Sequence, residues 1–336
     1  MSNQKFHKIS FCTTCMNRLE HLQKTLPKNL SDNANYPQVE FVVLDYNSTD
    51  GLEDWIQQNL RKWQDKVVYY KTLEPQSYAR SHSRNMAFRL ATGEILCNLD
   101  ADNFTGKDFV RYINKSFKKN SDIFLQAQKE NIQDIAGKIC LKKINFEEIN
   151  GYDEKIISYG FEDHDFKCRL RQSGLKPHFF GQNKFLKAIT HPDIERIRNE
   201  KIYQNLKQIF LQKISPINTK IFIVFNDLTF ESAEVLDNLF YLNETTQEQI
   251  KNLDTMFRFT IVENSIDRGN ISQLPPYLEE VTDENRKLSI IYFYTQIMNK
   301  SIWIENLENK TTIVNQSGYG QGVVYRNFDY SNPIHL

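Results

Sequence analysis

Two kinds of hydrophobic pattern alternate along the first 190 residues of the chain. Continuous apolar runs of strand length, such as VEFVVL at 39–44, are followed by stretches in which apolar residues recur every three or four positions. This alternation of strand and helix signals is typical of an α/β sheet whose strands are mostly parallel and buried on both faces. The pattern predicts strands at 8–13, 39–44, 66–71, 94–99, 123–127, 138–142 and 177–180. It predicts helices over 19–30, 52–60, 77–91, 109–117 and 161–172, with a helical turn at 146–149.

Two features interrupt this regular pattern. Pro27 falls inside the first helical stretch and predicts a kink or an early end there, because proline removes a backbone donor. Beyond about residue 200 the chain becomes rich in Asn, Gln and Glu, with apolar stretches at 220–225, 257–262 and 288–297. Helical patterns at 232–242 and 246–256 lie between them. We therefore expect one domain over 1–200 and a smaller α/β or α+β unit over 201–336, whose role the pattern leaves open.

Composition narrows the class of protein. With 336 residues, two domains are expected, and 40% hydrophobic residues suffice for a sizeable core. Basic and acidic residues number 42 each, which argues against a nucleic-acid partner bound through a broad basic surface. Apolar runs fall short of the roughly 20 residues of a membrane span, and the segment MSNQKFHKISFC lacks an apolar signal region, so a cytoplasmic protein is expected.

The five cysteines form no recognisable framework. Their number is odd, and without an export signal a disulfide scaffold is not expected. Cys12 and Cys15 have CxxC spacing, which would suit redox chemistry or half of a zinc site. A second CxxC is missing, so we favour two ordinary cysteines at the end of the first strand.

The most specific chemical signal is NLDADN at 98–103, directly after a predicted strand. Asp100 and Asp102 can direct both carboxylates to one point where the chain leaves the sheet, and such oxygen ligands suit Mg²⁺ or Mn²⁺. Open α/β sheets bind ligands at the carboxyl ends of their strands. The alternative is a solvated turn.

Positively charged and acidic side chains precede this motif. Arg80 and Arg84 are four residues apart and share a helix face, where they could neutralise a diphosphate or form a solvated cationic face. Asp45 follows another predicted strand. It could bind a nucleobase or ribose, or cap a turn.

Further carboxylates crowd the start of the helix predicted at 161–172. Glu162, Asp163 and Asp165 could interact with the helix dipole, or one could act as a general base while another holds the nucleophile. His191 follows an apolar stretch. It could be structural, or it could complete a metal site begun by Asp102.

Taken together and in order, these segments resemble a glycosyltransferase of the GT-A fold over roughly residues 5–195. FVVLDYNSTDG, ARSHSRNMAFRLATGEILCNLDADN and GKICLKKINFEEINGYDE look like family 2 transferases. SYGFEDHDFKCRLRQSG is similar to the C-terminal motif of the β-1,4-galactosyltransferase group, and HPDIER follows at the spacing of that group's metal-binding histidine. The fold implied is a mostly parallel sheet flanked by helices.

The resemblance assigns expected roles residue by residue. Asp45 and Arg84 would contact the nucleoside and diphosphate, and Asp100 the ribose or the metal. The metal ligands, for Mn²⁺ or Mg²⁺, would be Asp102 and His191, with Asp100. Glu162 and Asp163 would hold the sugar and acceptor, with Asp163 as the catalytic base.

The implied reaction is inverting transfer of a hexose or N-acetylhexosamine from a nucleotide sugar, such as a UDP-sugar, to a hydroxyl of a glycan or glycolipid in polysaccharide biosynthesis. A lipid-linked acceptor would place the protein at the inner face of the membrane. A retaining transferase, a nucleotidyltransferase and a silent nucleotide-sugar-binding module are alternatives. Two departures from the resembled motifs, Tyr159 and Phe161, leave the donor sugar open, and Tyr46 replaces the second acid of the more usual Asp-Asp pair.

Overall fold

The computed structural model describes residues 6–63, 66–127, 134–181, 183–238 and 258–336. The chain divides into two compact units. The first comprises 1–157, 162–191 and 306–336, and the second comprises 158–161 and 192–305. Residues 306–336, which the sequence pattern grouped with the C-terminal region, therefore lie in the same unit as the N-terminal residues.

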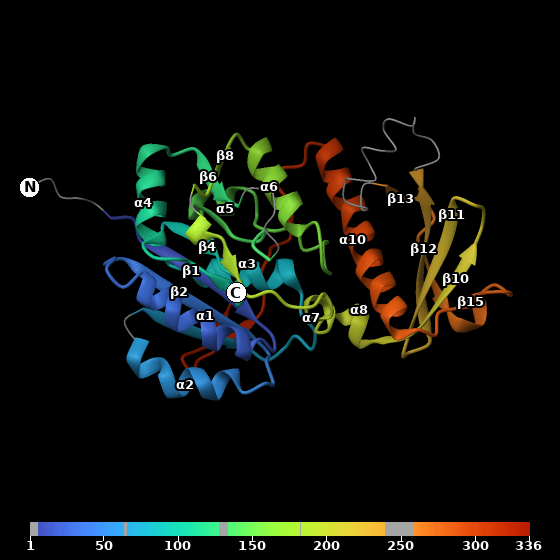
Figure 1. The fold of residues 1–336 in the computed structure, drawn as a ribbon, viewed down its shortest axis with the longest axis horizontal. Helices are drawn as coiled ribbons and strands as arrows, with labels where there is room; N and C mark the ends of the chain where they lie inside the picture. The colour runs from blue at the N-terminus through green and yellow to red at the C-terminus, as the bar shows by residue number, and fades with distance from the viewer. Residues whose placement is uncertain (1–5, 64–65, 128–133, 182, 239–257) are drawn as a thin grey trace, which may run out of the picture. The chain divides into compact units, whose positions relative to one another are not determined.

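The first unit is built on a nine-stranded sheet in the order β17-β16-β3-β2-β1-β4-β7-β6-β8 (Figure 1). Its centre, β3-β2-β1-β4, is parallel, whereas β7 pairs antiparallel with both β4 and β6. The strands of this unit are β1 Ile9–Cys15, β2 Val39–Tyr46, β3 Val67–Thr72, β4 Ile95–Asn98, β5 Asn103–Phe104, β6 Ile123–Gln126, β7 Ile139–Lys142, β8 Lys176–Phe179, β9 Lys187–Ala188, β16 Val323–Arg326 and β17 Ile334–His335. The predicted α/β class and mostly parallel sheet are confirmed.

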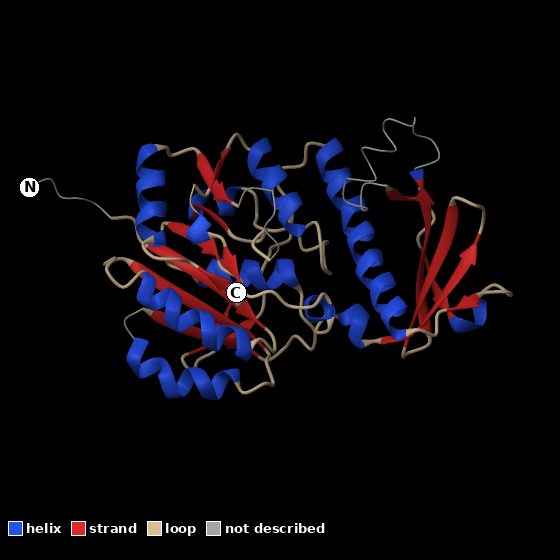
Figure 2. Ribbon diagram, in the orientation of Figure 1, coloured by secondary structure: helices blue, strands red, loops and turns tan. Residues whose placement is uncertain are grey.

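Helices cover both faces of this sheet (Figure 2). Side chains alternate along each strand, so Phe11 packs with α1, α2 and α4 in one core, whereas Cys12 packs with α3, α5 and α6 in the other. Both Cys12 and Cys15 are buried in β1, and burial raises the pKa of their thiols, as expected of ordinary core cysteines. The helices are α1 Leu19–Asp32, α2 Leu52–Trp63, α3 Arg80–Leu90, α4 Phe109–Lys119, α5 Lys143–Glu148 and α6 Glu162–Gln172, with a 3₁₀ turn, η1, at Asn183–Phe185.

Helix α1 does not end at Pro27, as one alternative from the sequence had it, but continues to Asp32. Leu22, Leu26 and Leu30 keep one face of the helix in the core on both sides of the proline. Their burial outweighs the loss of one backbone hydrogen bond.

The second unit contains an antiparallel sheet, β13-β12-β11-β10-β15, with β14 also paired to β12. Apolar residues of α10, including Ile291 and Ile297, pack on one face of it. Its elements are α7 Ile194–Ile197, α8 Lys201–Gln204, β10 Leu206–Lys213, β11 Asn218–Phe225, β12 Thr229–Asp237, β13 Phe259–Ile261, β14 Asp267–Asn270, η4 Ile271–Gln273, β15 Glu279–Glu280 and α10 Glu284–Glu308.

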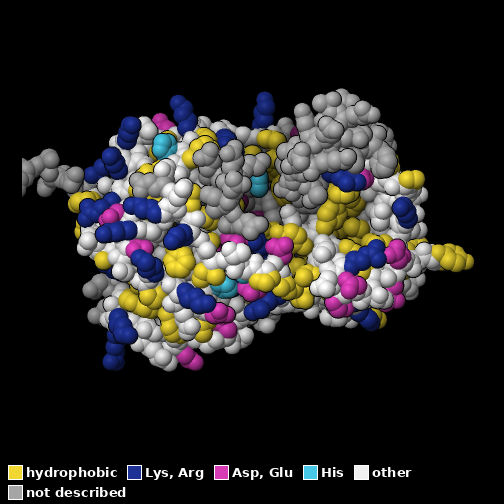
Figure 3. Space-filling model, viewed as in Figure 1, with side chains coloured by type: hydrophobic (Ala, Val, Ile, Leu, Met, Phe, Trp, Pro, Cys, Tyr) yellow, Lys and Arg dark blue, Asp and Glu magenta, His cyan; other side chains and the backbone are white. Residues whose placement is uncertain are grey.

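The helix predicted at 232–242 was wrong, because its first half belongs to strand β12. The apolar stretch at 288–297 lies inside α10, and the helix predicted at 246–256 falls outside the described residues. On the face drawn in Figure 3, basic and acidic side chains are interspersed, in keeping with the zero net charge. Among the described helices, none has the length and apolar character needed to cross a membrane.

Candidate active site

The carboxyl ends of the parallel strands carry the predicted chemistry. Asp45 lies at the end of β2, and the loop that follows β4 begins with Leu99 and Asp100. Because β1, β2 and β4 run parallel in adjacent positions, these segments end at one edge of the sheet, where α/β proteins bind ligands.

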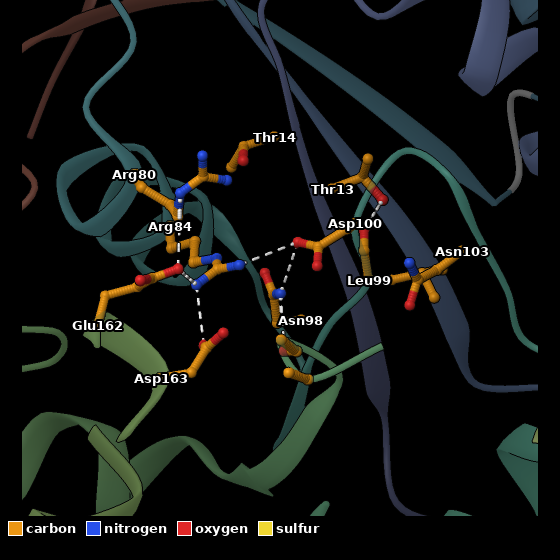
Figure 4. Close-up of polar contacts among 12 residues, drawn as sticks. Thr13, Thr14, Arg80, Arg84, Asn98, Leu99, Asp100, Asn103, Glu162 and Asp163 are labelled. Carbon is orange, nitrogen blue, oxygen red and sulfur yellow. Dashed lines mark hydrogen bonds and ion pairs between the residues drawn. The ribbon is translucent and has the colours of Figure 1, made fainter. Parts of the chain in front are cut away.

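Arg84 gathers three carboxylates from two segments of the first unit, the loop after β4 and the start of α6 (Figure 4). Its Nη1 donates to Asp163 Oδ1 at 2.9 Å and to Glu162 Oε1 at 3.2 Å. Its Nη2 donates to Asp100 Oδ1 at 3.2 Å, and Arg80 Nε lies 3.5 Å from Glu162 Oε1. The structure thus brings together five predicted site residues, but the guanidinium of Arg84 is engaged by carboxylates instead of facing an open diphosphate site.

Burial sets the electrostatics of this cluster. The side chains of Arg84 and Glu162 are only 3% and 6% exposed, whereas Asp163 is 12% exposed and Asp100 30%. Burial and the Asp163 carboxylate raise the pKa of Glu162, despite the two arginines. Burial also acts to raise the pKa of Asp100, but Arg84 and the Asn98 amide hold it below the usual value. Adjacent carboxylates therefore differ in their tendency to bind a proton.

Two residues that the sequence analysis did not single out shape this cluster. Asn98 Nδ2 donates to Asp100 Oδ1 at 3.0 Å and to the Gly137 carbonyl at 2.9 Å. A Cβ on Gly137 would lie 2.6 Å from Asp100 Oδ2 and 2.7 Å from Arg84 Nη2. A buried amide at a strand end was a detectable signal, since Asn is depleted in strands. The glycine, in a loop, gave none.

Asp102 and His191 form a second group in the first unit. His191 Nε2 lies 2.9 Å from Asp102 Oδ2, a hydrogen-bond distance, and metal binding by the two side chains stays a prediction. Their segments are joined by the short ladder between β5 and β9 and by Ile189 N–H, which donates to the Asp102 carbonyl at 2.9 Å. Over the described part of the chain, no group of three His, Cys, Asp or Glu side chains is arranged to hold a metal.

The chemistry of this donor set can be compared with the expected ion. A carboxylate oxygen beside an imidazole nitrogen suits Mn²⁺ better than Mg²⁺, which prefers oxygen ligands. Two protein ligands leave several positions for other oxygens. The pair therefore fits a manganese ion that also binds the phosphates of a substrate. Asp100 is hydrogen-bonded to Arg84, and its role as a metal ligand stays a prediction.

Asp45 has partners within its own segment of the sheet. One carboxylate oxygen accepts from Ser48 N–H and the other from Tyr69 Oη, both at 2.7 Å. Burial raises its pKa in spite of these hydrogen bonds. This geometry matches the turn-capping alternative, and contact with a nucleobase stays a prediction.

The start of α6 shows why one departure from the resembled motif matters. Phe161, where the galactosyltransferase group has glycine, adopts φ 66°, a conformation in the left-handed region that favours glycine.

Within α6, the Asp165 carboxylate forms an ion pair with Arg169 at 2.7 Å and accepts a hydrogen bond from Asn306 at 2.9 Å. Asp165 is therefore held by these two partners.

Comparison with known proteins gives the family. Residues 10–172 match the model of Glycosyl transferase family 2. A poly(ribitol-phosphate) beta-glucosyltransferase of Bacillus spizizenii is 28% identical over 119 residues, which cover 35% of this chain and 18% of the relative. The matched stretch thus spans less than a fifth of that protein.

Two solved structures are similar to part of the chain. Mannosyltransferase PcManGT from Pyrobaculum calidifontis, in complex with GDP-Man and Mn²⁺, has a TM-score of 0.49 and 18% identity, covering 56% of this chain and 59% of that one. A fragment of S. aureus TarS has a TM-score of 0.44 and 16% identity, covering 52% and 58%. Given the family match and the observed sheet, residues 10–172, just under half of the chain, form a domain of the Glycosyl transferase family 2 type on a GT-A-like sheet.

Proposed function

We propose that the protein transfers a hexose or N-acetylhexosamine from a UDP-sugar to a hydroxyl of a glycan or glycoconjugate, with inversion and with Asp163 as the base. The observation that carries the proposal is the buried Arg84 cluster at the strand ends. It fixes Asp163 and Glu162 beside Asp100, at the edge where a donor would bind.

Asp163 is the better placed of the two acids for proton transfer. It is twice as exposed as Glu162, and Arg84 occupies its Oδ1, so we assign proton acceptance to Oδ2. Glu162, more deeply buried and bonded to the same guanidinium, orients the arginine.

The reaction proceeds as a single displacement. The acceptor oxygen bonds to the anomeric carbon as the bond from that carbon to the diphosphate oxygen breaks, and the acceptor proton passes to Asp163 Oδ2. A Mn²⁺ ion held by Asp102 and His191 would offset charge on the diphosphate. Asp100 and Arg84 hold the loop after β4 and the start of α6 together, which fixes the position of Asp163 relative to that loop.

The proposed acceptor class takes support from the poly(ribitol-phosphate) beta-glucosyltransferase, whose name specifies a β product and a polyol-phosphate polymer. We propose a cytoplasmic reaction in polysaccharide biosynthesis, with peripheral contact at the inner face of the membrane if the acceptor is lipid-linked.

The first experiment is a thermal-shift screen of nucleotide sugars with and without Mn²⁺, because a ligand that binds the folded state raises the midpoint. A shift with UDP-sugars that requires Mn²⁺ is expected. No shift with any of them would reject the proposed donor and metal.

The second experiment replaces Asp163 with Asn and measures sugar transfer with the donor so identified. We expect a loss of roughly 100- to 10,000-fold, the contribution of a positioned base. Asp122→Asn, an exposed acid bonded to Ser121, is the matched control and should retain full activity. Transfer at the wild-type rate by folded Asp163→Asn would overturn the assignment, and an α product by NMR would indicate a retaining enzyme. Binding without transfer by the wild type would indicate a silent module.

A further inference from the structure

Lys138 is a buried charge that the proposed reaction does not use. It directly precedes β7, and its side chain is fully buried. Lysine is almost never fully buried without a charged partner. Its Nζ donates to two backbone carbonyls, of Phe104 at 2.8 Å and of Phe185 at 2.7 Å. Burial lowers the pKa of the ammonium to about 8, so burying the charge has a cost that its contacts must offset.

The two carbonyls belong to the two segments that carry the metal pair. Phe104 lies in β5, two residues after Asp102, and Phe185 ends η1, just before β9 and His191. β5 and β9 pair over only two residues each, a ladder too short to be stable by itself. Lys138 therefore joins both segments from a third part of the chain, next to the ladder that sets Asp102 opposite His191.

We propose that Lys138 is a positioning residue for metal binding, whose ammonium holds the β5 and β9 segments so that Asp102 and His191 face one ion. This inference rests on the proposed metal-dependent function. Lys138 does not touch the ion, and its positive charge near Asp102 would by itself oppose a cation. The sign of its effect is therefore informative.

The test measures Mn²⁺ binding by the full chain in the presence of UDP, from the loss of the free-ion EPR signal. Lys138→Met removes the donor and the charge at similar volume. Positioning predicts roughly 10- to 100-fold weaker Mn²⁺ binding, the usual effect of losing a residue that orients a ligand. Equal or tighter binding would overturn the proposal, since a purely electrostatic role predicts tightening.

A matched control separates positioning from general damage. Lys143, which follows β7 in the sequence, also donates a hydrogen bond from its Nζ to a backbone carbonyl, that of Ala91 at 2.7 Å. Lys143→Met should leave Mn²⁺ binding unchanged. If Lys138→Met does not fold, Lys138→Gln, which keeps a donor on a shorter chain, takes its place with the same expectation.

A double-mutant cycle provides the second readout. In a His191→Ala background the Lys138 substitution should have no further effect on Mn²⁺ affinity, because its target is already absent. Additive effects would assign Lys138 a merely structural role. If the wild type itself binds no Mn²⁺ with UDP, the proposed metal dependence fails; if it binds and Lys138→Met binds equally, only the present inference fails.

Discussion

Gly137 offers a way to disturb the active site without removing any functional group. A Cβ at this position would lie 2.6 Å from Asp100 Oδ2 and 2.7 Å from Arg84 Nη2, whereas ordinary contact begins at 3.4 Å. Both side chains would have to retreat, and Arg84 is fixed on its other side by Glu162 and Asp163. We therefore expect Gly137→Ala to displace the whole cluster and not only one atom.

The magnitudes follow from this geometry. A retreat of about 0.8 Å by Asp100, or a similar one by Arg84, approaches the displacement of 1 Å that can reduce a rate about 100-fold. Overpacking in a well-packed region costs about 1–3 kcal/mol, and each kcal/mol lowers the thermal midpoint by about 2–4 °C in a domain of this size. The expected result is a large loss of kcat with a modest loss of stability.

The assay compares kcat for sugar transfer and the thermal midpoint of the variant with those of the wild type and Gly181→Ala. A Cβ on Gly181 meets nothing within 4 Å, and its φ lies outside the left-handed region, so this control should match the wild type in both. If Gly137→Ala kept kcat within about threefold of the wild type, contrary to the 100-fold estimate, the tight packing around Arg84 would not matter for catalysis.

Two further predictions concern the pH dependence of stability. Arg84 and Asn98 keep the pKa of Asp100 below its unfolded value of 3.8, so the ionised form contributes stability at neutral pH that is lost as the pH falls through the folded pKa. Asp100→Asn should thus lower the thermal midpoint at pH 7, and the difference from wild type should shrink below pH 3.8; a difference that stays constant would contradict this. Glu162 has the opposite shift: its folded pKa exceeds 4.5, so stability declines as the pH rises through that value. Glu162→Gln should show less decline as the pH rises above 4.5, and melting curves with parallel pH profiles would refute the shift.

The central strands of the first unit, β1 to β4, were predictable because they are buried on both faces. A run such as 39–44 has apolar residues on both faces and a single polar one, Glu40, which favours a central strand. Strand β12 was not predictable, because Glu231, Ala233 and Glu234 are compatible with a helix. Pairing with β11, β13 and β14 overrides that local preference.

The cluster around Arg84 joins residues that the sequence singled out, but the contacts between them were not predictable. Positions after predicted strands singled out Asp45, Asp100 and Asp102, and helix spacing grouped Arg80 with Arg84. That Arg84 bonds Asp100, Glu162 and Asp163 depends on how α3 and α6 pack, which no local pattern encodes. Gly137 and Lys138 act through a close approach and through backbone carbonyls, contacts that leave no sequence motif.

The first unit is built from segments at both ends of the sequence, and this has a consequence for folding during synthesis. Residues 306–336 complete it: β16 adds to β3, and Asn327 accepts from the Tyr69 N–H across a separation of 258 positions. Asn315 likewise donates to the carbonyls of Asn150 and Tyr152. Chains emerge from the ribosome N-terminus first, so this unit cannot close until the second has been synthesised. Until then, a nascent chain would expose the edge of β3, and an unpaired strand edge is a site for aggregation. A truncation after residue 200 would leave this edge permanently unpaired.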